Sequence, residues 1–400
     1  MPVPLYIDIF AGCGGLSTGL YNAGWHGIFA IEKNEDAFLT LKYNLMDKKH
    51  HFSWPRWLPK EPCDINVLLK DYTDKLISLQ GKVMLVAGGP PCQGFSMAGK
   101  RNYNDKRNDL VKSYIKFINF IKPEVIIFEN VHGFTLEFKE KKRTRKYSSY
   151  VEKALRKEGY KVHSQIIDMS EFGIPQNRKR FILIAMLKHD PQKVFATILQ
   201  NKKIFLSKKG LSEKTTVFEA IGDLEKSIGT EPSPDTNGFE AGVYGQKNSA
   251  YQKLMRYKRL SKNRLPDSHR FVNHRPKTIE LHQNLLNHAP SGKRISQNND
   301  CAFIINRRGV TVLDKNGQAP TLTSIPDEII HYCEPRVLTV REHARLQSFP
   351  DWFEFKGKYT SGSIRRTYEV PRYTQVGNAV PPLFAEQVGH ALLEVLSNYE

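Results

Sequence analysis

One cysteine of the chain has neighbours that suit a reactive thiol. Cys92 lies within residues 88–96 (GGPPCQGFS), directly after an apolar segment, 83–87, that is typical of a strand. The rigid Pro-Pro pair before it and the glycines around it would expose and aim the thiol. A lone cysteine is more often a buried structural residue, but α/β sheets bind their ligands at the carboxyl ends of strands. The position therefore favours a functional thiol.

Charged side chains adjoin two other apolar segments. Glu129 follows residues 123–128, where it could act as a general acid or be an ordinary surface carboxylate. Arg178 and Arg180 precede the apolar segment 181–187, and their spacing of two places them on one side of an extended chain. Two such guanidiniums can pair a carboxylate and hold a carbonyl oxygen. A solvated edge or a phosphate-binding pair is the simpler explanation of these arginines.

A glycine-rich turn near the N-terminus suits a bound nucleoside. Residues 8–16 (DIFAGCGGL) combine the end of a predicted strand, a glycine turn and the start of a helix, where polar or anionic groups bind favourably. Glu32 closes the next strand about 20 residues on, where a carboxylate can accept both hydroxyls of a ribose. The GxGxxG form of dinucleotide sites is absent. A purely structural glycine turn would explain the pattern as well.

These residues need a scaffold, and the first part of the chain alternates strand-like and helix-like segments as parallel α/β sheets do. Strands are predicted at 5–10, 27–31, 83–87, 123–128, 160–167 and 181–187, and helices at 16–23, 37–44, 110–121 and 150–158. The sequence therefore predicts the α/β class, with a catalytic and cofactor-binding domain over residues 1–187.

The alternation stops after this domain. Residues 188–318 are polar, basic and irregular in pattern, with a loop or linker predicted at 228–238, and we expect a smaller, irregular recognition domain there. Residues 319–400 contain a helix at 340–347 with Thr339 as its N-cap, whose expected role is to brace that domain. This last segment is predicted to return to the catalytic domain.

Composition limits the class of protein. The chain has 400 residues, 40% of them hydrophobic, and a formal charge of +19, which favours nucleic acid as a partner unless the charge serves only solubility. Its five cysteines form no CxxC pair, so neither zinc nor a disulfide framework is indicated. The apolar runs are too short to cross a bilayer, and no signal peptide precedes the first strand, so we expect a cytoplasmic protein.

Six segments occur in an order that resembles a known motif series. FAGCGG, GGPPCQGFS, ENV, QNRKR, RLQSFP and GNAVPP look like the motifs of the DNA cytosine-C5 methyltransferases, in particular the bacterial enzymes. The resemblance covers residues 5–187 and 319–395, and the family keeps its variable target recognition domain between these stretches. It implies a Rossmann-like sheet of the kind found in S-adenosylmethionine-dependent methyltransferases.

The resemblance also implies a mechanism. The thiolate of Cys92 would attack C6 of cytosine, which activates C5 to accept the methyl group, and loss of the C5 proton would release the enzyme. Glu129 would bind or protonate the N3 edge, Arg180 would hold the O2 carbonyl, and Arg178 would orient the acidic partner. The target base would have to leave the duplex, at a cost of a few kcal/mol of unstacking.

Binding residues follow from the same resemblance. S-adenosylmethionine would be bound by residues at family positions, with no metal required: Phe10, Gly12, Gly14, Glu32, Asp64, Ile65, Pro90, Leu110, Asn378 and Val380. DNA contacts are expected from a basic loop at 93–108 and from basic residues of the recognition domain, although a solvated loop and solvated charges are the alternative. The residues predicted to contact DNA are Gln93, Ser96, Lys100, Arg101, Arg256, Arg259, Arg264 and Arg270.

Other functions remain open at this point. An RNA cytosine methyltransferase acting on tRNA would share the fold, but the Cys-Phe-Thr signature of that branch is absent. A catalytically silent DNA-binding protein would lack the nucleophile or the acid, and a small-molecule methyltransferase would not explain the basic lobe. We expect a monomeric enzyme of a bacterial restriction-modification system that acts on double-stranded DNA, with any cognate endonuclease acting separately.

Overall fold

The computed structural model divides the chain into two compact units, each described here by itself. The described residues are 3–91, 109–140, 143–257, 265–296, 309–361 and 369–397. The first unit comprises Met1–Asp168, Lys179–Lys202 and Phe384–Glu400, and the second comprises Met169–Arg178 and Lys203–Leu383. The domain boundaries predicted at 187/188 and 318/319 do not coincide with these divisions. The functional roles assigned to the predicted domains stay predictions.

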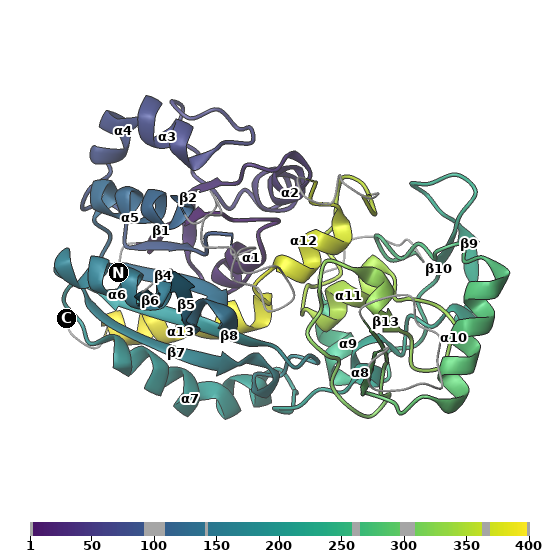
Figure 1. The fold of residues 1–400 in the computed structure, drawn as a ribbon. Helices are drawn as coiled ribbons and strands as arrows, with labels where there is room; N and C mark the ends of the chain where they lie inside the picture. The colour runs from purple at the N-terminus through teal and green to yellow at the C-terminus, as the bar shows by residue number, and fades with distance from the viewer. Residues whose placement is uncertain are drawn as a thin grey trace. The chain divides into compact units, whose positions relative to one another are not determined.

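A six-stranded sheet forms the centre of the first unit (Figure 1). Its strand order is β2-β1-β3-β4-β8-β7, with the first four strands parallel and β8 antiparallel to both β4 and β7. The strands are β1 (Leu5–Ile9), β2 (His26–Ile31), β3 (Leu85–Gly88), β4 (Val125–Val131), β7 (Lys161–Asp168) and β8 (Lys179–Met186). The predicted α/β class is confirmed, and each predicted strand is present.

Helices cover this sheet because their apolar residues recur with helical spacing. The helices with their main part in the first unit are α1 (Gly15–Asn22), α2 (Glu35–Leu41), α3 (Ile65–Asp71), α4 (Thr73–Ile77), α5 (Asp109–Ile121), α6 (Tyr147–Lys157), α7 (Pro191–Lys208) and α13 (Pro382–Ser397). Residues of α3, α5 and α6 share one apolar cluster with the strands, and α3, α4 and α5 lie together in Figure 1. The indole of Trp25 donates to the carbonyl of Gly389, at 3.0 Å, which fixes α13 to the chain entering β2.

Short elements complete the first unit. A π-helix, Lys42–Lys48, continues α2, and a 3₁₀ helix, His132–Thr135, follows β4. The strands β5 (Phe138–Glu140) and β6 (Arg143–Arg145) form an antiparallel pair. No helix in the described part of the chain is long and apolar enough to cross a membrane.

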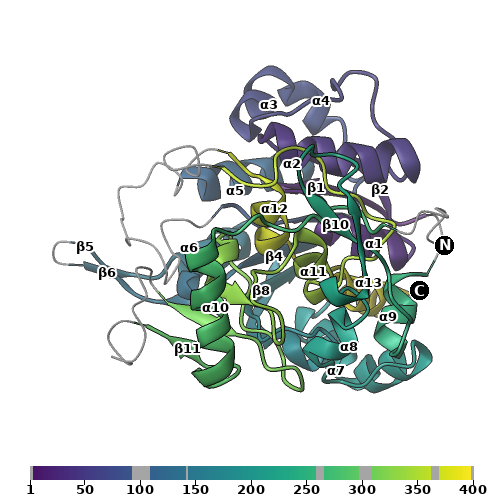
Figure 2. The same cartoon turned by 90° about the vertical axis from the view of Figure 1, so that its right-hand side faces the viewer.

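The second unit is built from short elements. An antiparallel hairpin joins β9 (Thr230–Pro232) to β10 (Glu240–Gly242), and β11 (Arg294–Ile295), β12 (Val310–Val312) and β13 (Ile329–Ile330) form a small sheet. Apolar residues of α10 pack against that sheet, and Figure 2 shows α10 beside β11. The helices are α8 (Val217–Ile221), α9 (Ala250–Met255), α10 (Pro276–His288), α11 (Val340–Leu346) and α12 (Arg372–Asn378), with 3₁₀ turns at Met169–Glu171, Lys226–Ile228 and Pro326–Glu328.

Two expectations for this part of the chain were wrong. The loop or linker predicted at 228–238 contains a 3₁₀ turn, the strand β9 and the turn of a hairpin, because strands this short carry almost no periodic signal. The stretch predicted to be irregular begins with α7, a helix of 18 residues that the sequence analysis did not identify. Its many lysines made the segment look polar overall, so the helical spacing of its apolar residues was not recognised.

The helix predicted at 340–347 is α11, and its N-terminus is as expected. Thr339 is the N-cap, and its side chain accepts from the N–H of Glu342, whose carboxylate accepts in return from the N–H of Thr339. This capping box satisfies two backbone donors at the helix start. Every residue of α11 is buried, so the helix forms part of the interior of the second unit.

Candidate active site

The glycine-rich turn after β1 is fastened to the end of β2 by Glu32. The N–H of Gly12 donates to one oxygen of this carboxylate at 2.9 Å, and the N–H of Asn34 donates to the other at 2.7 Å. Phe10, Gly12 and Gly14 all have positive φ, at 60°, 56° and 92°, so the turn uses a backbone conformation that glycine adopts easily. Burial raises the pKa of Glu32. Each oxygen still has lone-pair capacity for a ligand hydroxyl.

A second carboxylate near this turn was missed by the sequence analysis. Asp8 is buried in β1, where Ser17 of α1 donates to its Oδ2 at 2.6 Å. Its Oδ1 is buried and has no hydrogen-bond partner among the described residues. Burial raises the pKa of Asp8 to about 7. The available signal was a single acidic residue inside an otherwise apolar strand.

The residues next to Glu32 include two predicted cofactor positions. The N–H of Cys63 donates to the carbonyl of Glu32 at 2.8 Å, which brings the following Asp64 and Ile65 to the end of β2. Asp64 caps α3 and pairs with Lys33 at 2.8 Å, while Ile65 is buried. Partial burial would raise the pKa of Asp64, but the ion pair with Lys33 outweighs it and lowers the pKa. This carboxylate is therefore already engaged by protein groups.

Leu110 reaches the same side of the sheet through α5. Its side chain packs against the apolar core, and the hydroxyl of Ser113 one turn later donates to Asn66 of α3 at 2.6 Å. This bond ties α5 to the helix that begins after Asp64. The structure thus associates Leu110 with the elements that carry Asp64 and Ile65.

The chain that leads to Cys92 is anchored where β3 and β4 end. The side chain of Asn130 donates to the carbonyl of Pro90 at 3.3 Å. A Cβ atom added at Gly89 would lie 2.3 Å from the carbonyl oxygen of Glu129, so only glycine allows this close approach. Asn130 was not identified from sequence, since its role depends on a carbonyl 40 residues earlier. Cys92 itself lies outside the described residues, as do Gln93, Ser96, Lys100 and Arg101.

Glu129 and Arg180 meet at this edge of the sheet. The antiparallel pairing of β4 with β8 sets Val131 opposite Arg180, and the Nε of Arg180 lies 3.2 Å from Oε1 of Glu129. Both side chains are mostly covered, with exposed fractions of 12% and 14%. A carboxyl group beside a guanidinium offers a proton donor or acceptor next to a fixed hydrogen-bond donor.

The predicted site residues of the first unit therefore share one edge. The strand order places the ends of β2, β1, β3 and β4 side by side, and the start of β8 joins them because β8 runs in the opposite direction. Ligands of open α/β sheets bind outside the carboxyl ends of the strands. The residues at this edge are Phe10, Gly12, Gly14, Glu32, Asp64, Ile65, Pro90, Glu129 and Arg180.

Arg178 belongs to the second unit, where it holds the segment that contains Asn378. Its Nη1 donates to the carbonyl of Gly377 at 3.1 Å and its Nη2 to that of Ala379 at 2.9 Å, and the side chain is buried. Asn378 is exposed and Val380 is half-buried. The part of these two residues in a cofactor site, and that of Arg178 beside an acid, stay predictions.

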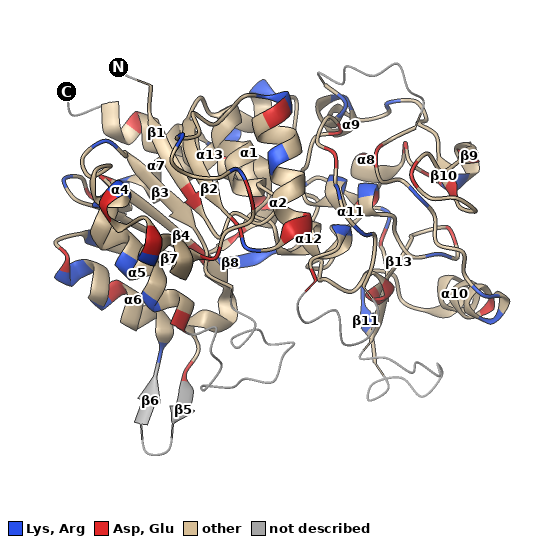
Figure 3. Cartoon of the chain, turned by 90° about the horizontal axis from the view of Figure 1, so that it is seen from above, with Lys and Arg blue, Asp and Glu red and all other residues tan. Residues whose placement is uncertain are grey.

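The arginines predicted to contact DNA have different surroundings. Arg256 lies over the ring of Tyr244 at 4.2 Å and pairs with buried Asp223 at 3.2 Å. Arg270 lies over the ring of Tyr359 and lines a pocket. Arg259 and Arg264 lie outside the described residues. Figure 3 shows Lys and Arg on elements of both units, so no single helix carries the basic charge.

Comparisons with known proteins agree with this geometry. The model of the C-5 cytosine-specific DNA methylases matches residues 5–394. The chain is 33% identical to the type II methyltransferase M.DdeI of Desulfomicrobium norvegicum, over 98% of this chain and 88% of that protein. It is 29% identical to M.XorII of Xanthomonas oryzae, over 99% of this chain and 86% of that protein.

Solved structures give the same result for the fold. A chain named as a DNA modification methyltransferase encoded within an E. coli prophage matches with a TM-score of 0.67 and 25% identity, covering 98% of this chain and 99% of that one. The Dnmt2 methyltransferase of S. pombe matches with a TM-score of 0.56 and 15% identity, over 99% of each chain, which is a likeness of fold alone. The chain belongs to the C-5 cytosine-specific DNA methylases and is a DNA (cytosine-5-)-methyltransferase.

Proposed function

We propose that the enzyme transfers a methyl group from S-adenosylmethionine to C5 of a flipped-out cytosine in a specific duplex sequence, through a covalent adduct between Cys92 and C6. The observation that carries the proposal is the meeting of Glu129, Arg180 and Pro90 at the ends of β3, β4 and β8. Cys92 follows Pro90 by two residues in the sequence. The proposed nucleophile therefore follows, two residues along the chain, a segment that ends beside a carboxyl group and a guanidinium.

The three cysteines that the structure describes, Cys13, Cys63 and Cys333, are poorly suited to act as the nucleophile. Burial raises the pKa of Cys13 and of Cys333 to about 12, and it raises the pKa of Cys63 as well. A thiol needs its thiolate form to attack, so these three are weak nucleophiles at neutral pH. Among the cysteines that the structure describes, none competes with Cys92 for the assignment.

The protein groups can move the charges and protons of the reaction. The Sγ of Cys92 adds to C6 of cytosine, while Glu129 donates to N3 and Arg180 holds O2, so that electron density collects at C5. C5 would then accept the methyl group as the bond between the methyl carbon and the sulfonium sulfur breaks, which leaves a neutral thioether. The C5 proton leaves to a base, the C6–S bond breaks to regenerate the thiolate, and N3 returns its proton to Glu129. Splitting the reaction in this way avoids direct attack by an unactivated ring carbon.

The turn after β1 and the end of β2 suit the methyl donor. Glu32 can accept the two ribose hydroxyls while its oxygens keep the backbone bonds from Gly12 and Asn34, which fixes the carboxylate in place. The glycines leave room for a ligand against the backbone. When bound, S-adenosylmethionine supplies an electrophilic methyl group on a sulfonium centre.

The names of the type II relatives suggest the biological setting. We propose that this enzyme protects DNA in a bacterial restriction-modification system, as a cytoplasmic monomer whose cognate endonuclease acts separately. One molecule is sufficient because one strand is methylated at a time. Flipping the base costs a few kcal/mol of unstacking, which contacts to the DNA backbone offset.

Replacing the nucleophile is the first test of the proposed function. Cys92→Ala should reduce methyl transfer from labelled S-adenosylmethionine to mixed-sequence duplex DNA by at least about 10⁴-fold, since no other group can activate C6. Digestion to nucleosides should yield 5-methyldeoxycytidine with the unchanged enzyme alone. DNA binding, measured by fluorescence anisotropy, should stay within a few-fold of the original.

A matched control and a second substrate make this test decisive. Cys63→Ala changes a thiol of raised pKa and should leave methyl transfer in place. Duplex DNA with 5-fluorocytosine should stall as a covalent complex, because fluorine cannot leave C5 as a proton does. Turnover by Cys92→Ala would refute the covalent step, and label found in tRNA alone would assign the enzyme to RNA.

A further inference from the structure

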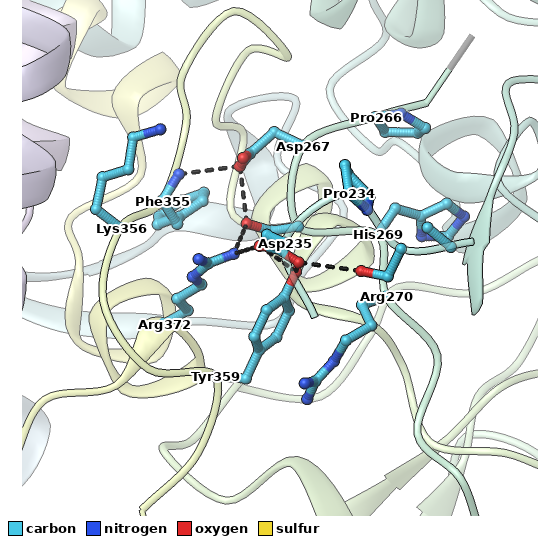
Figure 4. Close-up of a pocket in the computed structure, with 13 residues that line it drawn as sticks. Pro234, Asp235, Pro266, Asp267, His269, Arg270, Phe355, Lys356, Tyr359 and Arg372 are labelled. Atoms are coloured by element: carbon cyan, nitrogen blue, oxygen red, sulfur yellow. Dashed lines mark hydrogen bonds and ion pairs between the residues drawn. The ribbon is translucent and has the colours of Figure 1, made fainter. Parts of the chain in front are cut away.

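The pocket that Arg270 lines is small and lies within the second unit. It has a volume of about 140 Å³ and is lined by the turn of the β9–β10 hairpin, residues 266–270, residues 355–359 and Arg372 (Figure 4). Two arginines, Arg270 and Arg372, flank the ring of Tyr359 in this pocket, with their Cζ atoms 3.7 and 4.2 Å from the ring centroid. Figure 4 shows the two guanidinium groups on either side of this tyrosine.

Arg372 is fully engaged by protein groups. Its Nη1 lies 2.6 Å from Oδ2 of Asp235 and 3.0 Å from the hydroxyl of Ser268, and its Nε donates to the carbonyl of Gly357 at 2.9 Å. The hydroxyl of Tyr359 donates to Asp235 at 3.0 Å. Burial alone would raise the pKa of Asp235, but the hydrogen bond and charge of Arg372 outweigh burial and lower it, so the carboxylate stays ionised. These bonds fix the plane of the tyrosine ring.

Arg270 forms fewer polar contacts with protein groups than Arg372 does. Its guanidinium lies between the rings of Tyr359, at 3.7 Å, and Phe239, at 4.2 Å. Within the described parts of the chain it makes one side-chain hydrogen bond, from Nη1 to the hydroxyl of Thr236 at 3.3 Å, and no ion pair. Its Nε is buried without a partner. Burial lowers the pKa of this guanidinium, and the charge of Asp235 opposes that shift only in part.

Other arginines of the same unit show how unusual this is. Arg256 pairs with Asp223, Arg341 with Asp267 at 3.0 Å, and Arg345 with both Asp223 and Asp351. A half-buried guanidinium that forms no direct ion pair loses hydration and gains less from a counter-charge than a paired one does. Such a group is stabilised when a ligand brings hydrogen-bond acceptors to it.

The geometry limits which ligand this can be. Aromatic rings cover both faces of the Arg270 guanidinium, so only its edge can donate. The edge of a guanidinium presents donors in one plane, which match the O6 and N7 acceptors of guanine in the major groove. A phosphate also offers two acceptors, but phosphate contacts do not require a side chain held rigidly in one orientation.

The sequence beside the pocket agrees with a nucleic-acid ligand. Residues 258–264, which precede the pocket residues 266–270, contain two lysines, two arginines and no acidic residue. Residues 362–368, which follow Tyr359, contain two arginines and no acidic residue. Positive charge of this density favours contact with the DNA backbone. A base-reading arginine needs such contacts around it to set its register.

We infer that Arg270 is a specificity-determining residue, which donates to O6 and N7 of one guanine in the recognised DNA sequence. Tyr359 and Phe239 hold its guanidinium between their rings, and Asp235 with Arg372 fixes the tyrosine. This inference rests on the proposed function, because it assumes a specific duplex substrate. It adds which side chain reads a base and which base that is.

Substrate preference is the property that tests this role. A library of duplexes with random sequence would be methylated by the full-length enzyme and by Arg270→Lys, and the methylated cytosines would be read by sequencing. Lysine keeps the charge but loses the planar fork. We expect Arg270→Lys to lower the preference for guanine at one fixed position by about 10- to 100-fold, with other positions unchanged.

Three controls separate reading a base from other roles. Arg294→Lys changes an arginine of the same unit that pairs with Glu328 at 3.4 Å, and it should leave the preference intact. Tyr359→Leu removes one of the two rings and should weaken the preference at the same position. Substrates with 7-deazaguanine there should slow the unchanged enzyme but not slow Arg270→Lys further, because N7 is already unread.

Other outcomes would overturn the inference. A uniform loss on all sequences, with a salt dependence shallower by about one counterion, would make Arg270 a phosphate contact. An unchanged preference with a lower unfolding temperature would make it structural. Absence of any DNA methylation by the unchanged enzyme would refute the proposed function, which the same library detects separately.

Discussion

The interiors of the two units are stabilised by different interactions. In the first unit the central strands bury apolar side chains such as Val86, Ile126 and Phe128, all fully covered. In the second unit the helix α11 buries Arg341 and Arg345 with no exposed surface. The hydrophobic effect is non-directional, so an apolar core does not depend on exact geometry. Buried charges need hydrogen-bond and ion-pair partners in fixed positions.

The charged side chains around α11 form hydrogen-bonded ion pairs of this kind. Arg345 donates through Nε to Asp351 at 2.5 Å and through Nη1 to Asp223 at 3.2 Å. One turn earlier, Arg341 donates to Asp267 at 3.0 Å, and Glu342 receives two bonds from Arg336 at 2.7 and 2.8 Å. The bonds to Asp223 and Asp267 join segments distant in sequence. These bonds tie α11 into the second unit, and its role in bracing a recognition domain stays a prediction.

The comparison extends to the acidic residues of each unit. Asp8 in the first unit has no counter-charge among the described residues, and burial raises its pKa to about 7. Glu342 in the second unit is buried as well, but Arg336 outweighs the burial and lowers its pKa to about 2. The first unit thus holds a buried, unpaired acid near the edge where the predicted cofactor residues lie, while in the second unit paired acids hold short elements together.

Breaking the charge network should have the largest effect on stability. Arg345→Met keeps much of the side-chain volume but leaves Asp223 and Asp351 with a lost partner, at an expected cost of about 3–5 kcal/mol in the free energy of unfolding. Urea unfolding followed by tryptophan fluorescence would measure this change, in a background where Trp25, Trp54 and Trp57 are replaced by Phe so that Trp352 reports on the second unit.

A surface ion pair of the same unit provides the control. Lys226 pairs with Glu240 at 2.8 Å, with side chains 45% and 54% exposed, so Lys226→Met should cost less than about 1 kcal/mol. Equal losses in the two variants would show that the buried network has no special role. The contrast between the two units would then need another explanation.

The pH dependence of stability should have opposite signs in the two units. Asp8 has a pKa of 3.8 when unfolded and about 7 when folded, so below about pH 4 it costs nothing. As the pH rises from about 4 to 7, the unfolded chain loses the proton first and folding stability falls, by up to about 4 kcal/mol. Asp8→Asn should remove this fall and be the more stable protein at pH 8.

Glu342 provides the comparison for this prediction. Its pKa falls from 4.5 to about 2 on folding, so its contribution is complete above about pH 4.5 and is lost as the pH falls toward 2. Glu342→Gln should therefore destabilise the protein at pH 7 but not at pH 2. Unfolding curves between pH 2 and 8 would measure both, and a pH dependence unchanged by Asp8→Asn would contradict the account given for that residue.

The difference between the units also explains what the sequence could predict. Long apolar strands and amphipathic helices identify themselves by periodicity, so β1, β2, β4 and α5 were expected close to their observed bounds. Strand ends then located Glu32 and Glu129. In the second unit two-residue and three-residue strands carry no such period, and the hairpin that forms the pocket was predicted as a loop.

The missed site features depend on contacts between distant residues. Nothing in the sequence around Asn130 indicates a bond to Pro90, and nothing near Arg270 distinguishes it from Arg256. From the sequence, both arginines were grouped by their charge. The structure separates them by a direct ion pair, which buried Asp223 forms with Arg256 and which no carboxylate of the described residues forms with Arg270. Pairing of this kind is a property of the fold.

A change confined to apolar contacts should have the smallest effect and sharpens the contrast between the units. Ile126 is fully buried in β4, three residues before Glu129, and Ile126→Val removes one methylene without altering any hydrogen bond. The expected loss is about 0.5–1.5 kcal/mol. It should be the same at pH 5 and pH 8 and in low and high salt, because no charge is involved.

Urea unfolding in a Trp352→Phe background would follow the first unit through Trp25, Trp54 and Trp57. Methyl transfer per folded molecule should remain unchanged, and a loss of activity larger than the loss of folded protein would mean that packing in β4 also positions Glu129.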